Sequence, residues 1–281
     1  MICAVTAVSG HLGREIALKL MDRLGAGQVV GLARTPDRAS DLGVEVRPGD
    51  YDEPDQLVAS LQGVGALVLV SGMAPPDDRI QQHRNVIEAA KAAGVRKIIY
   101  TSIQGPDTGT AFSPVVQSNR QTEADVQASG PEWAIGRNGI YIEPDVEYID
   151  SYRATGTIAN SAGNGRCGYT TRSELAHAYA ALAIREDLNG QTFDLNGTPI
   201  TQMQLALYLN KAFGTDLSYR AMKSADFVAD RTAELGAFIG PIIGGIYDGI
   251  RHGAYDRPGD FEAVTGRPHQ SWDDYFADLA G

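Results

Sequence analysis

The sequence predicts a doubly wound α/β fold, in which helices cover both faces of a parallel sheet, followed by a smaller C-terminal α+β lobe. Two observations in the first half predict the sheet. Apolar, β-branched runs lie at residues 2–6, 28–34, 44–50, 66–72, 97–102 and 133–139, and stretches with apolar residues three and four positions apart separate them. Strands that are apolar on both faces and alternate with helices are typical of a parallel sheet buried on both sides.

A third observation predicts the lobe, because the regular alternation stops after about residue 143. Helices are expected in DVEYIDSYRA, SELAHAYAALAIRED and TQMQLALYLNKAFG, strands in GQTFDLNG and LSYRAM, and a run of helices from Ser224 to the end. We expect a dinucleotide-binding domain over residues 1–143. We expect residues 144–281 to form mostly a substrate-binding lobe on the carboxyl edge of the sheet, with some segments returning to the sheet. Ligands of open α/β sheets bind at that edge.

Composition and charge exclude several classes of protein. The chain has 281 residues, 43% of them hydrophobic and 21% charged, which predicts a globular protein with a large core. A net charge of −11 argues against a nucleic-acid partner. Two cysteines are too few for a disulfide scaffold and have the wrong spacing for a zinc site, so no metal is expected.

No export signal is expected, because Met1 leads directly into the first strand. The longest late apolar stretch, residues 238–247, is half the length of about twenty residues that a membrane span needs. It is expected to line either a pocket or a subunit contact. We therefore expect a cytoplasmic protein with no membrane partner, either a monomer or a homodimer, that acts on a small-molecule substrate.

The stretch VTAVSGHLG, residues 5–13, lies where a dinucleotide-binding chain carries its glycine-rich phosphate turn. Such a turn needs a tight reversal, close backbone approach to the pyrophosphate, and a helix N-terminus with free N–H groups. Gly10 and Gly13 meet the last two needs, but Ala7 stands where the reversal occurs. The turn either follows a different path or tolerates strain. On the motif alone, an ordinary strand-to-helix turn is equally well supported.

Two polar residues at strand ends favour a particular cofactor. Arg34 ends the second strand, where the adenosine ribose of a bound dinucleotide would lie. A guanidinium there pairs with a 2′-phosphate and therefore favours NADP(H) over NAD(H). The alternative is a solvated charge at the strand end. Asp50 is placed to receive the adenine amino group, although Asp52 nearby shows that aspartate also occurs here as a helix cap.

These segments resemble the NmrA-like atypical short-chain dehydrogenases, and most closely the bacterial NADPH-dependent quinone oxidoreductases of the non-zinc type. The resemblance covers nearly the whole chain. It rests on VTAVSGHLG, VVGLARTP, LQGVGALVLVSG, RNGIYIE and SAGNGRCGYTTRSELAHAYAAL, and most specifically on QHRNVIEAAKAAGVRKIIYTS. It implies a Rossmann fold, a bound NADP(H) and hydride transfer.

The resemblance also implies which residues hold the cofactor. The turn would contact the phosphates, Arg34 the 2′-phosphate, and the end of the fourth strand would form a wall beside the cofactor. The nicotinamide would lie near Asn138, Gly139 and Tyr141, and Arg166 would lie near the cleft. The implied cofactor contacts are Thr6, Ala7, Ser9, Gly10, His11, Leu12, Arg34, Asp50, Ser71, Gly72, Met73, Thr101, Asn138, Gly139 and Arg166. The alternatives are a plain strand-end turn at 71–73 and a core role for Tyr141.

Catalysis has fewer candidates. No Tyr/Lys pair of the usual short-chain dehydrogenase kind occurs near residues 113–126. Asn119 stands where the resembling quinone reductases have a histidine, and an amide cannot act as an acid. Asn119 and Tyr141 are the catalytic candidates, and His83 is either an acid or a structural hydrogen-bonding residue. A quinone tolerates the lack of an acid, because its reduced oxyanion is a weak base.

We therefore expect an NADPH-dependent reductase of a quinone or a similar conjugated, electron-poor molecule. The alternatives are a reductase of an aryl ketone, an enone or a dye, and a sensor that binds NADP without turning it over.

Overall fold

The computed structural model describes residues 1–280 and contains a seven-stranded sheet in which every neighbouring pair of strands is parallel. The strand order is β11-β6-β5-β4-β1-β2-β3, so the winding direction reverses between β1 and β4. The strands are β1 (Ile2–Val5), β2 (Val29–Ala33), β3 (Glu45–Pro48), β4 (Val64–Val70), β5 (Lys97–Ile103), β6 (Glu132–Asn138) and β11 (Gln191–Leu195). The predicted doubly wound parallel sheet is confirmed.

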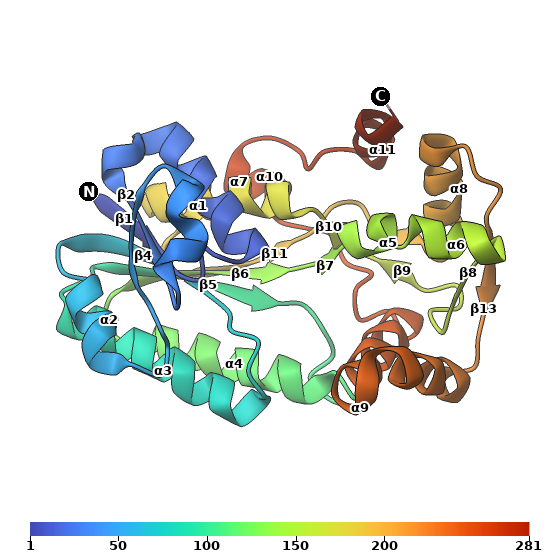
Figure 1. The fold of residues 1–281 in the computed structure, drawn as a ribbon, viewed down its shortest axis with the longest axis horizontal. Helices are drawn as coiled ribbons and strands as arrows, with labels where there is room; N and C mark the ends of the chain where they lie inside the picture. The colour runs from blue at the N-terminus through green and yellow to red at the C-terminus, as the bar shows by residue number, and fades with distance from the viewer. Residues whose placement is uncertain (281) are drawn as a thin grey trace.

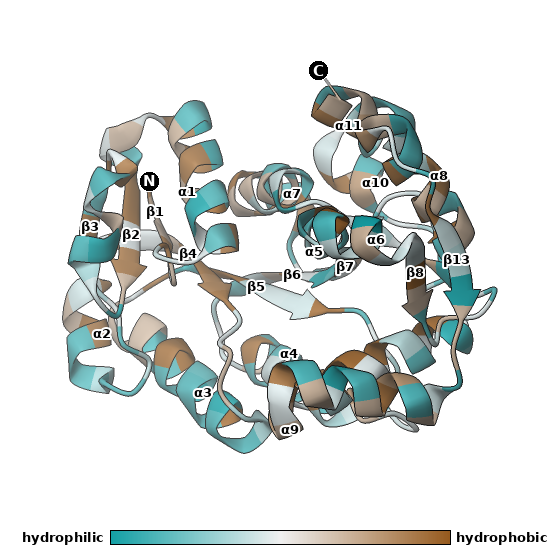
Figure 2. Ribbon diagram, turned by 45° about the vertical axis from the view of Figure 1, so that its right-hand side comes forward, coloured by the Kyte–Doolittle hydropathy of each residue, from teal (hydrophilic) through white to brown (hydrophobic). Residues whose placement is uncertain are grey.

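Helices cover both faces of this sheet (Figure 1). One face carries α1 (His11–Leu24) and α7 (Arg172–Ile184), with α10 (Phe261–Thr265) packed on α7; the other carries α2 (Pro54–Ser60), α3 (Pro76–Ala92) and α4 (Ser113–Gln127). Successive strand residues point to opposite faces, so Val5 belongs to the first core and Ala4 to the second. Figure 2 shows the apolar β2 between helices whose outer surfaces are mostly hydrophilic. This two-sided burial explains the continuous apolar strands of the sequence.

Two elements from the second half of the sequence complete this first body. Helix α7 packs against α1, and β11 pairs with β6 from Gln191↔Ala134 to Leu195↔Asn138. Short 3-10 helices lie at η1 (Ala26–Gln28), η2 (Pro36–Leu42) and η3 (Glu186–Leu188). The chain therefore leaves the sheet after β6 and returns to it through α7 and β11.

The remaining elements form a second lobe beside the carboxyl edge of the sheet (Figure 1). Three two-stranded pairs organise it: β7 (Ile140–Tyr141) with β10 (Tyr169–Thr170), β9 (Arg166–Cys167) with β12 (Ile200–Thr201), and β8 (Thr157–Asn160) with β13 (Ser218–Ala221). Its helices are α5 (Glu143–Glu147), α6 (Ile149–Thr155), α8 (Gln202–Phe213), α9 (Ser224–Arg251) and α11 (Trp272–Ala280). Sequence periodicity predicted α8 and β13, whereas the two-residue strands are too short to produce a pattern.

Helix α9 is a hairpin of two helical halves. The backbone of Gly236 (φ 84°, ψ 170°) breaks the helix, and a glycine adopts this positive φ without strain. The halves then pack together, since a side chain at Gly244 would collide with Val228, and Ser224 Oγ bonds Asp248 Oδ1. Phe238, at the tip, is 52% exposed. The stretch around residues 238–247 is therefore one arm of a hairpin with an apolar tip.

No helix within residues 1–280 combines the length and the apolar character that crossing a bilayer requires. The same part of the chain holds no group of three or more histidine, cysteine, aspartate or glutamate side chains arranged to bind a metal ion.

Candidate active site

Of the two alternatives for the turn after β1, the strained conformation is the one adopted. Ala7 has φ 53° and is the only non-glycine residue within residues 1–280 with a positive φ. The Gly10 N–H donates to Ala7 O over 2.9 Å and closes the turn. A left-handed conformation costs an alanine about 1 kcal/mol. The chain thus keeps the path of a glycine-rich turn despite the alanine.

The N-terminus of α1 is open to an anion. Its N-cap, Gly10, offers no capping side chain, and the first turn of α1 contains no acidic residue. The first N–H groups of the helix are therefore available, and the helix dipole favours negative charge beside them. Ser9, Gly10 and His11 are exposed around this end, whereas Leu12 is buried in the core. This arrangement fits a pyrophosphate.

Thr6 and Gly13 hold the turn in place from beneath. Thr6 is fully buried, and its hydroxyl accepts a hydrogen bond from Val70 N–H over 2.9 Å, which ties β1 to β4. Gly13 lets α1 approach the turn, because a Cβ there would lie 2.5 Å from Ala7 O and 2.8 Å from Thr6 O. Thr6 therefore supports the turn rather than presenting a side chain at its surface.

Replacing Ala7 with glycine should release about 1 kcal/mol of strain, partly offset because glycine has more freedom in the unfolded chain. We expect the melting temperature to stay level or rise, and NADPH affinity to stay level or rise by at most about fivefold. Thermal unfolding and an NADPH titration of Ala7→Gly check this. A loss of affinity would mean that the Ala7 methyl group itself contributes to the site.

Positive charge gathers at the end of β2. Arg34 is exposed, and within residues 1–280 its guanidinium has no hydrogen-bond or ion-pair partner. The same is true of Arg38 on η2, whose N–H bonds Thr35 O. Arg38 was not among the predicted site residues, although its position four residues after Arg34 was a visible signal. Asp50 accepts a hydrogen bond from Asp52 N–H on Oδ1, so part of its carboxylate is occupied within its own loop.

Hydrogen bonds from beneath fix the loop after β4. Ser71 N–H donates to Thr101 Oγ1, and Gly72 N–H donates to His83 Nε2, each over 2.9 Å. Because Nε2 accepts, the proton of the neutral ring lies on Nδ1, which donates to Thr122 Oγ1 over 2.9 Å. Burial, together with the charge of Arg79, lowers the pKa of His83 to about 3. His83 is therefore a neutral structural residue. Met73, at the tip of the loop, is 84% exposed.

Both polar atoms of the Asn119 side chain are hydrogen-bonded inside the protein. Its side-chain oxygen accepts from the Tyr100 hydroxyl over 2.6 Å and from Ser71 Oγ over 3.3 Å. Its Nδ2 donates to Val115 O over 2.8 Å, and the residue is 1% exposed. Asn119 thus supports Ser71 from the interior.

Asn138, Gly139 and Tyr141 come together where β6 ends. Asn138 Oδ1 accepts a hydrogen bond from the Tyr179 hydroxyl (2.5 Å), and its Nδ2 donates to Tyr141 Oη (3.2 Å). Gly139 N–H donates to Leu195 O over 3.0 Å, and a side chain at Gly139 would collide with Gly168 O. Burial raises the pKa of Tyr141 to about 12. Its hydroxyl therefore stays protonated near neutrality and can orient an oxygen atom.

A buried ion cluster lies beneath the ends of β5 and β6. Glu123, 4% exposed, accepts hydrogen bonds from Ser102 Oγ (2.6 Å), from both Nε and Nη2 of Arg137 (2.9 and 2.6 Å) and from Arg120 (2.8 Å). Burial alone would raise the pKa of Glu123, but these hydrogen bonds and the two guanidinium charges hold it below its usual range. The cluster joins α4 to the strand residue that precedes Asn138.

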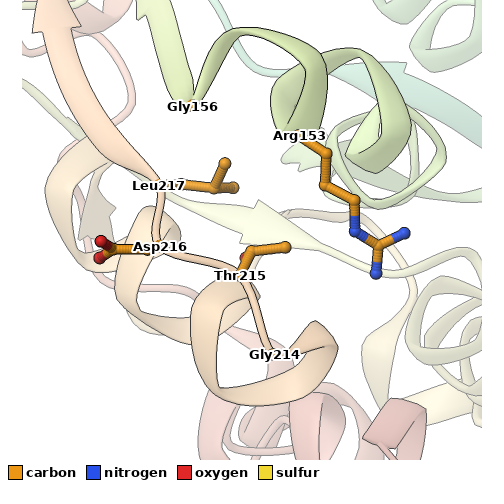
Figure 3. A pocket seen from close by; sticks show the side chains of 6 residues that line it. All are labelled: Arg153, Gly156, Gly214, Thr215, Asp216 and Leu217. Atoms are coloured by element: carbon orange, nitrogen blue, oxygen red, sulfur yellow. The ribbon is translucent and has the colours of Figure 1, made fainter.

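Arg166 lies apart from these groups, on β9 of the second lobe. Its guanidinium donates to Pro199 O over 2.7 Å and lies 3.5 Å from Asp256 Oδ1. A surface hollow of about 350 Å³ also lies in that lobe, where α6 and α8 end (Figure 3). Arg153 at its rim is already bonded to Asp150 and to Phe213 O. Neither feature adds a group to the strand-end site.

Comparisons with known proteins agree with this geometry. The profile of the NAD(P)H-binding family matches residues 8–185. Quinone oxidoreductase 2 of Escherichia coli (strain K12) is 35% identical over 232 residues, which cover 80% of this chain and 79% of that protein. The crystal structure of the NADPH-dependent quinone oxidoreductase from Escherichia coli complexed with NADPH superimposes with a TM-score of 0.91 at 30% identity, covering all of both chains. The Citrobacter sp. triphenylmethane reductase complexed with NADP(H) gives a TM-score of 0.90 at 27% identity, covering 99% of each chain.

Proposed function

Because the chain belongs to the NAD(P)H-binding, NmrA-like oxidoreductases, we propose that it reduces a quinone or a similarly planar, electron-poor molecule with NADPH. The cofactor supplies a hydride when it is bound. The observation that supports this most is the combination of the open N-terminus of α1 with two unpaired arginines, Arg34 and Arg38, after β2. The helix N-terminus fits a pyrophosphate, and the arginines fit a 2′-phosphate.

Each part of the strand-end site has a role in this proposal. The turn from Ala7 to Leu12 holds the pyrophosphate, Arg34 and Arg38 hold the 2′-phosphate, and Asp50 receives the adenine. The wall beside the cofactor consists of Ser71, Gly72 and Met73. Hydrogen bonds to Thr101 and His83 hold the N–H groups of Ser71 and Gly72, and so keep this loop in position. Tyr141 and Asn138 lie at the nicotinamide end, where the protonated Tyr141 hydroxyl orients the oxygen of the substrate. Orientation of this kind supplies much of the rate of hydride transfer.

An exposed apolar surface of the second lobe supports a planar substrate. Phe238, Ile239 and Leu235 leave an apolar tip on the α9 hairpin, and Tyr148 links that tip to the α5–α6 segment through Glu234. Apolar and aromatic walls with few polar groups are typical of sites for small aromatic ligands. The likeness to triphenylmethane reductase favours a second candidate, reduction of a triphenylmethane dye.

The test is NADPH oxidation with a panel of quinones and triphenylmethane dyes, with the products identified by chromatography. Steady turnover with quinones and formation of the hydroquinone support the first candidate, and a leuco dye as the preferred product supports the second. Tight NADPH binding without turnover on any acceptor would contradict both and favour a sensor.

Replacing Arg34 with alanine should weaken NADPH binding by about 1.5 to 3 kcal/mol, because a charge-assisted hydrogen bond to the 2′-phosphate is lost. NADH, which lacks that phosphate, is the matched control ligand and should bind Arg34→Ala as it binds the parent protein. Arg220, an exposed arginine of β13, provides the control variant Arg220→Ala. Calorimetric titrations measure all of these affinities. Equal affinity of the parent protein for NADPH and NADH would contradict the assignment.

A further inference from the structure

Helix α7 carries a single tyrosine, Tyr179, whose hydroxyl reaches the end of β6. The residue is fully buried, and most of its neighbours along the helix are alanines. The Tyr179 hydroxyl donates to Asn138 Oδ1 over 2.5 Å and lies 2.8 Å from Gly136 O. A Cβ at Gly136 would lie 2.6 Å from this hydroxyl, so the strand has a glycine where the hydroxyl approaches. A phenylalanine would fill the same space in the core, so packing alone does not account for the hydroxyl.

The distances determine which way round the Asn138 amide lies. O–H···O hydrogen bonds span about 2.5 to 3.0 Å, and N–H···O bonds about 2.7 to 3.2 Å. At 2.5 Å the Tyr179 hydroxyl therefore faces the amide oxygen, and at 3.2 Å the Tyr141 hydroxyl faces the amide nitrogen. Burial raises the pKa of Tyr179 well above its ordinary value, so the hydroxyl keeps the proton that it donates. The amide consequently donates to Tyr141 and does not accept from it.

This orientation leaves the proton of the Tyr141 hydroxyl for a ligand. Tyr141 Oη accepts from Asn138 Nδ2. A reversed amide would instead place Oδ1 against Tyr141, where it would accept the phenol proton. A hydroxyl that accepts one hydrogen bond is polarised and donates more strongly to the next group. The orientation of one amide group thus decides whether Tyr141 offers its proton outward.

The position of Tyr141 is that of a residue in the strand-end site. It is half-buried and lies three residues after the end of β6. It packs against the apolar core between the sheet and helices α1 and α7, as Ala7 of the first turn does. In the sheet, only β5 and β4 separate β6 from β1, and these parallel strands all end at the same edge. Tyr141 and the phosphate turn therefore share one face of the edge at which ligands of such sheets bind.

We propose that Tyr179 is a positioning residue of the reductase, which acts through Asn138 to keep the Tyr141 hydroxyl turned toward the substrate oxygen. This inference rests on the proposed function. As hydride is added to a quinone, the quinone oxygen gains negative charge. A hydrogen bond donated by Tyr141 is then stronger in the transition state than in the ground state, which raises kcat. Tyr179 keeps its own proton throughout, so its buried hydroxyl needs no path to solvent.

The test is a cycle of Tyr179→Phe, Tyr141→Phe and the double variant, with 1,4-benzoquinone as the acceptor. Phenylalanine keeps the buried ring of Tyr179 and removes only the hydroxyl. One hydrogen bond shifts the balance between the two amide orientations by about tenfold, so Tyr179→Phe should lower kcat by about tenfold. Tyr141→Phe should lower kcat by about 10²-fold. The double variant should be no slower than Tyr141→Phe, because Tyr179 acts through Tyr141. The KM for the quinone and the affinity for NADPH should stay at the parent values in Tyr179→Phe.

Crystal violet separates positioning from general damage to the site. Hydride adds to a carbon atom of this triphenylmethane dye, which contains no oxygen, so its reduction does not need the Tyr141 hydrogen bond. Tyr179→Phe should therefore reduce crystal violet as fast as the parent protein does. Tyr255→Phe is the matched control, since Tyr255 is also fully buried and its hydroxyl has no hydrogen-bond partner within residues 1–280. This control should keep the parent kcat with the quinone.

Parent-like quinone turnover by Tyr179→Phe would overturn the positioning role and leave the proposed function intact. The role is also overturned if the two effects multiply in the double variant, or if turnover falls equally with quinone and dye. A Tyr179→Phe protein that loses NADPH binding would assign the hydroxyl to folding, and a parent protein that reduces only the dye would leave Tyr141 no oxygen to orient. Both results contradict the inference. If the parent protein reduces the quinone alone, the cycle of variants decides; if it reduces neither acceptor, the proposed function fails and the inference fails with it.

Discussion

NADPH binding is expected to be lost when Gly13 is replaced with alanine. The added Cβ would lie 2.5 Å from Ala7 O and 2.8 Å from both Ala7 C and Thr6 O. These are backbone atoms of a turn whose φ is already positive, so no side chain can swing away to make room. Helix α1 must move off β1 instead, and its N–H groups then leave the position that the pyrophosphate requires. We expect affinity to fall at least about 100-fold and unfolding stability to fall by about 1 to 3 kcal/mol.

Two other glycines provide graded controls for this experiment. A Cβ at Gly10 would lie 3.3 Å from Ala7 O, so Gly10→Ala needs only a small shift. A Cβ at Gly27 would meet nothing within 4 Å. Affinity measured by NADPH fluorescence should therefore rank Gly27→Ala first, Gly10→Ala second and Gly13→Ala last. Tight binding by Gly13→Ala would mean that the cofactor does not depend on the contact between α1 and this turn.

Replacing Glu123 with alanine is expected to destabilise the protein by about 2 to 3 kcal/mol, because it leaves two partly buried guanidinium groups without their shared carboxylate. Arg137 and Arg120 both bond this one carboxylate, and Ser102 would lose its acceptor as well. Chemical denaturation measures the change in unfolding free energy. The pKa of Glu123 is lower in the folded state than in the unfolded state. The stability that Glu123 contributes is therefore present at pH values above its unfolded-state pKa, and it is lost as the pH falls through its folded-state pKa.

Glu88 provides the control for Glu123. It forms an i,i+3 ion pair with Lys91 on the surface of α3, and its side chain is 67% exposed. Exposed pairs contribute less than about 1 kcal/mol, so Glu88→Ala should change stability little. If the two variants were equally stable, the buried cluster would not contribute to stability beyond an ordinary surface pair.

The strands of the sheet were predictable because burial on both faces leaves a direct record in the sequence. The predicted runs at residues 97–102 and 133–139 differ by one residue at the ends from β5 and β6. The path of the first turn was less determined, since Ala7 allowed either a different path or strain. The closing bond from Gly10 N–H to Ala7 O and the close approach of Gly13 explain why the strained path is the one adopted.

Other features depended on contacts that no local pattern records. The hydrogen bond from Tyr179 to Asn138 joins α7 to the end of β6, so it cannot be inferred from the neighbours of either residue in the sequence. For His83, the structural role was one of the two alternatives that the sequence left open, and the bond from Gly72 N–H decides it. The interior role of Asn119 was hidden, because it depends on the Ser71 hydroxyl in the loop after β4. Arg38 was the exception, since its spacing from Arg34 was visible and was overlooked.

The packing of α1 on α7 has a consequence for how the protein folds. Helix α1 ends at Leu24 and α7 begins at Arg172, so one helical layer cannot form until more than half of the chain has been synthesised. Strand β11 joins the sheet later still, and until then β6 presents an open edge. Contacts so distant in sequence slow folding, and an unpaired edge invites association with other chains. A nascent chain that has completed β6 but not β11 should therefore be the stage that most needs a chaperone.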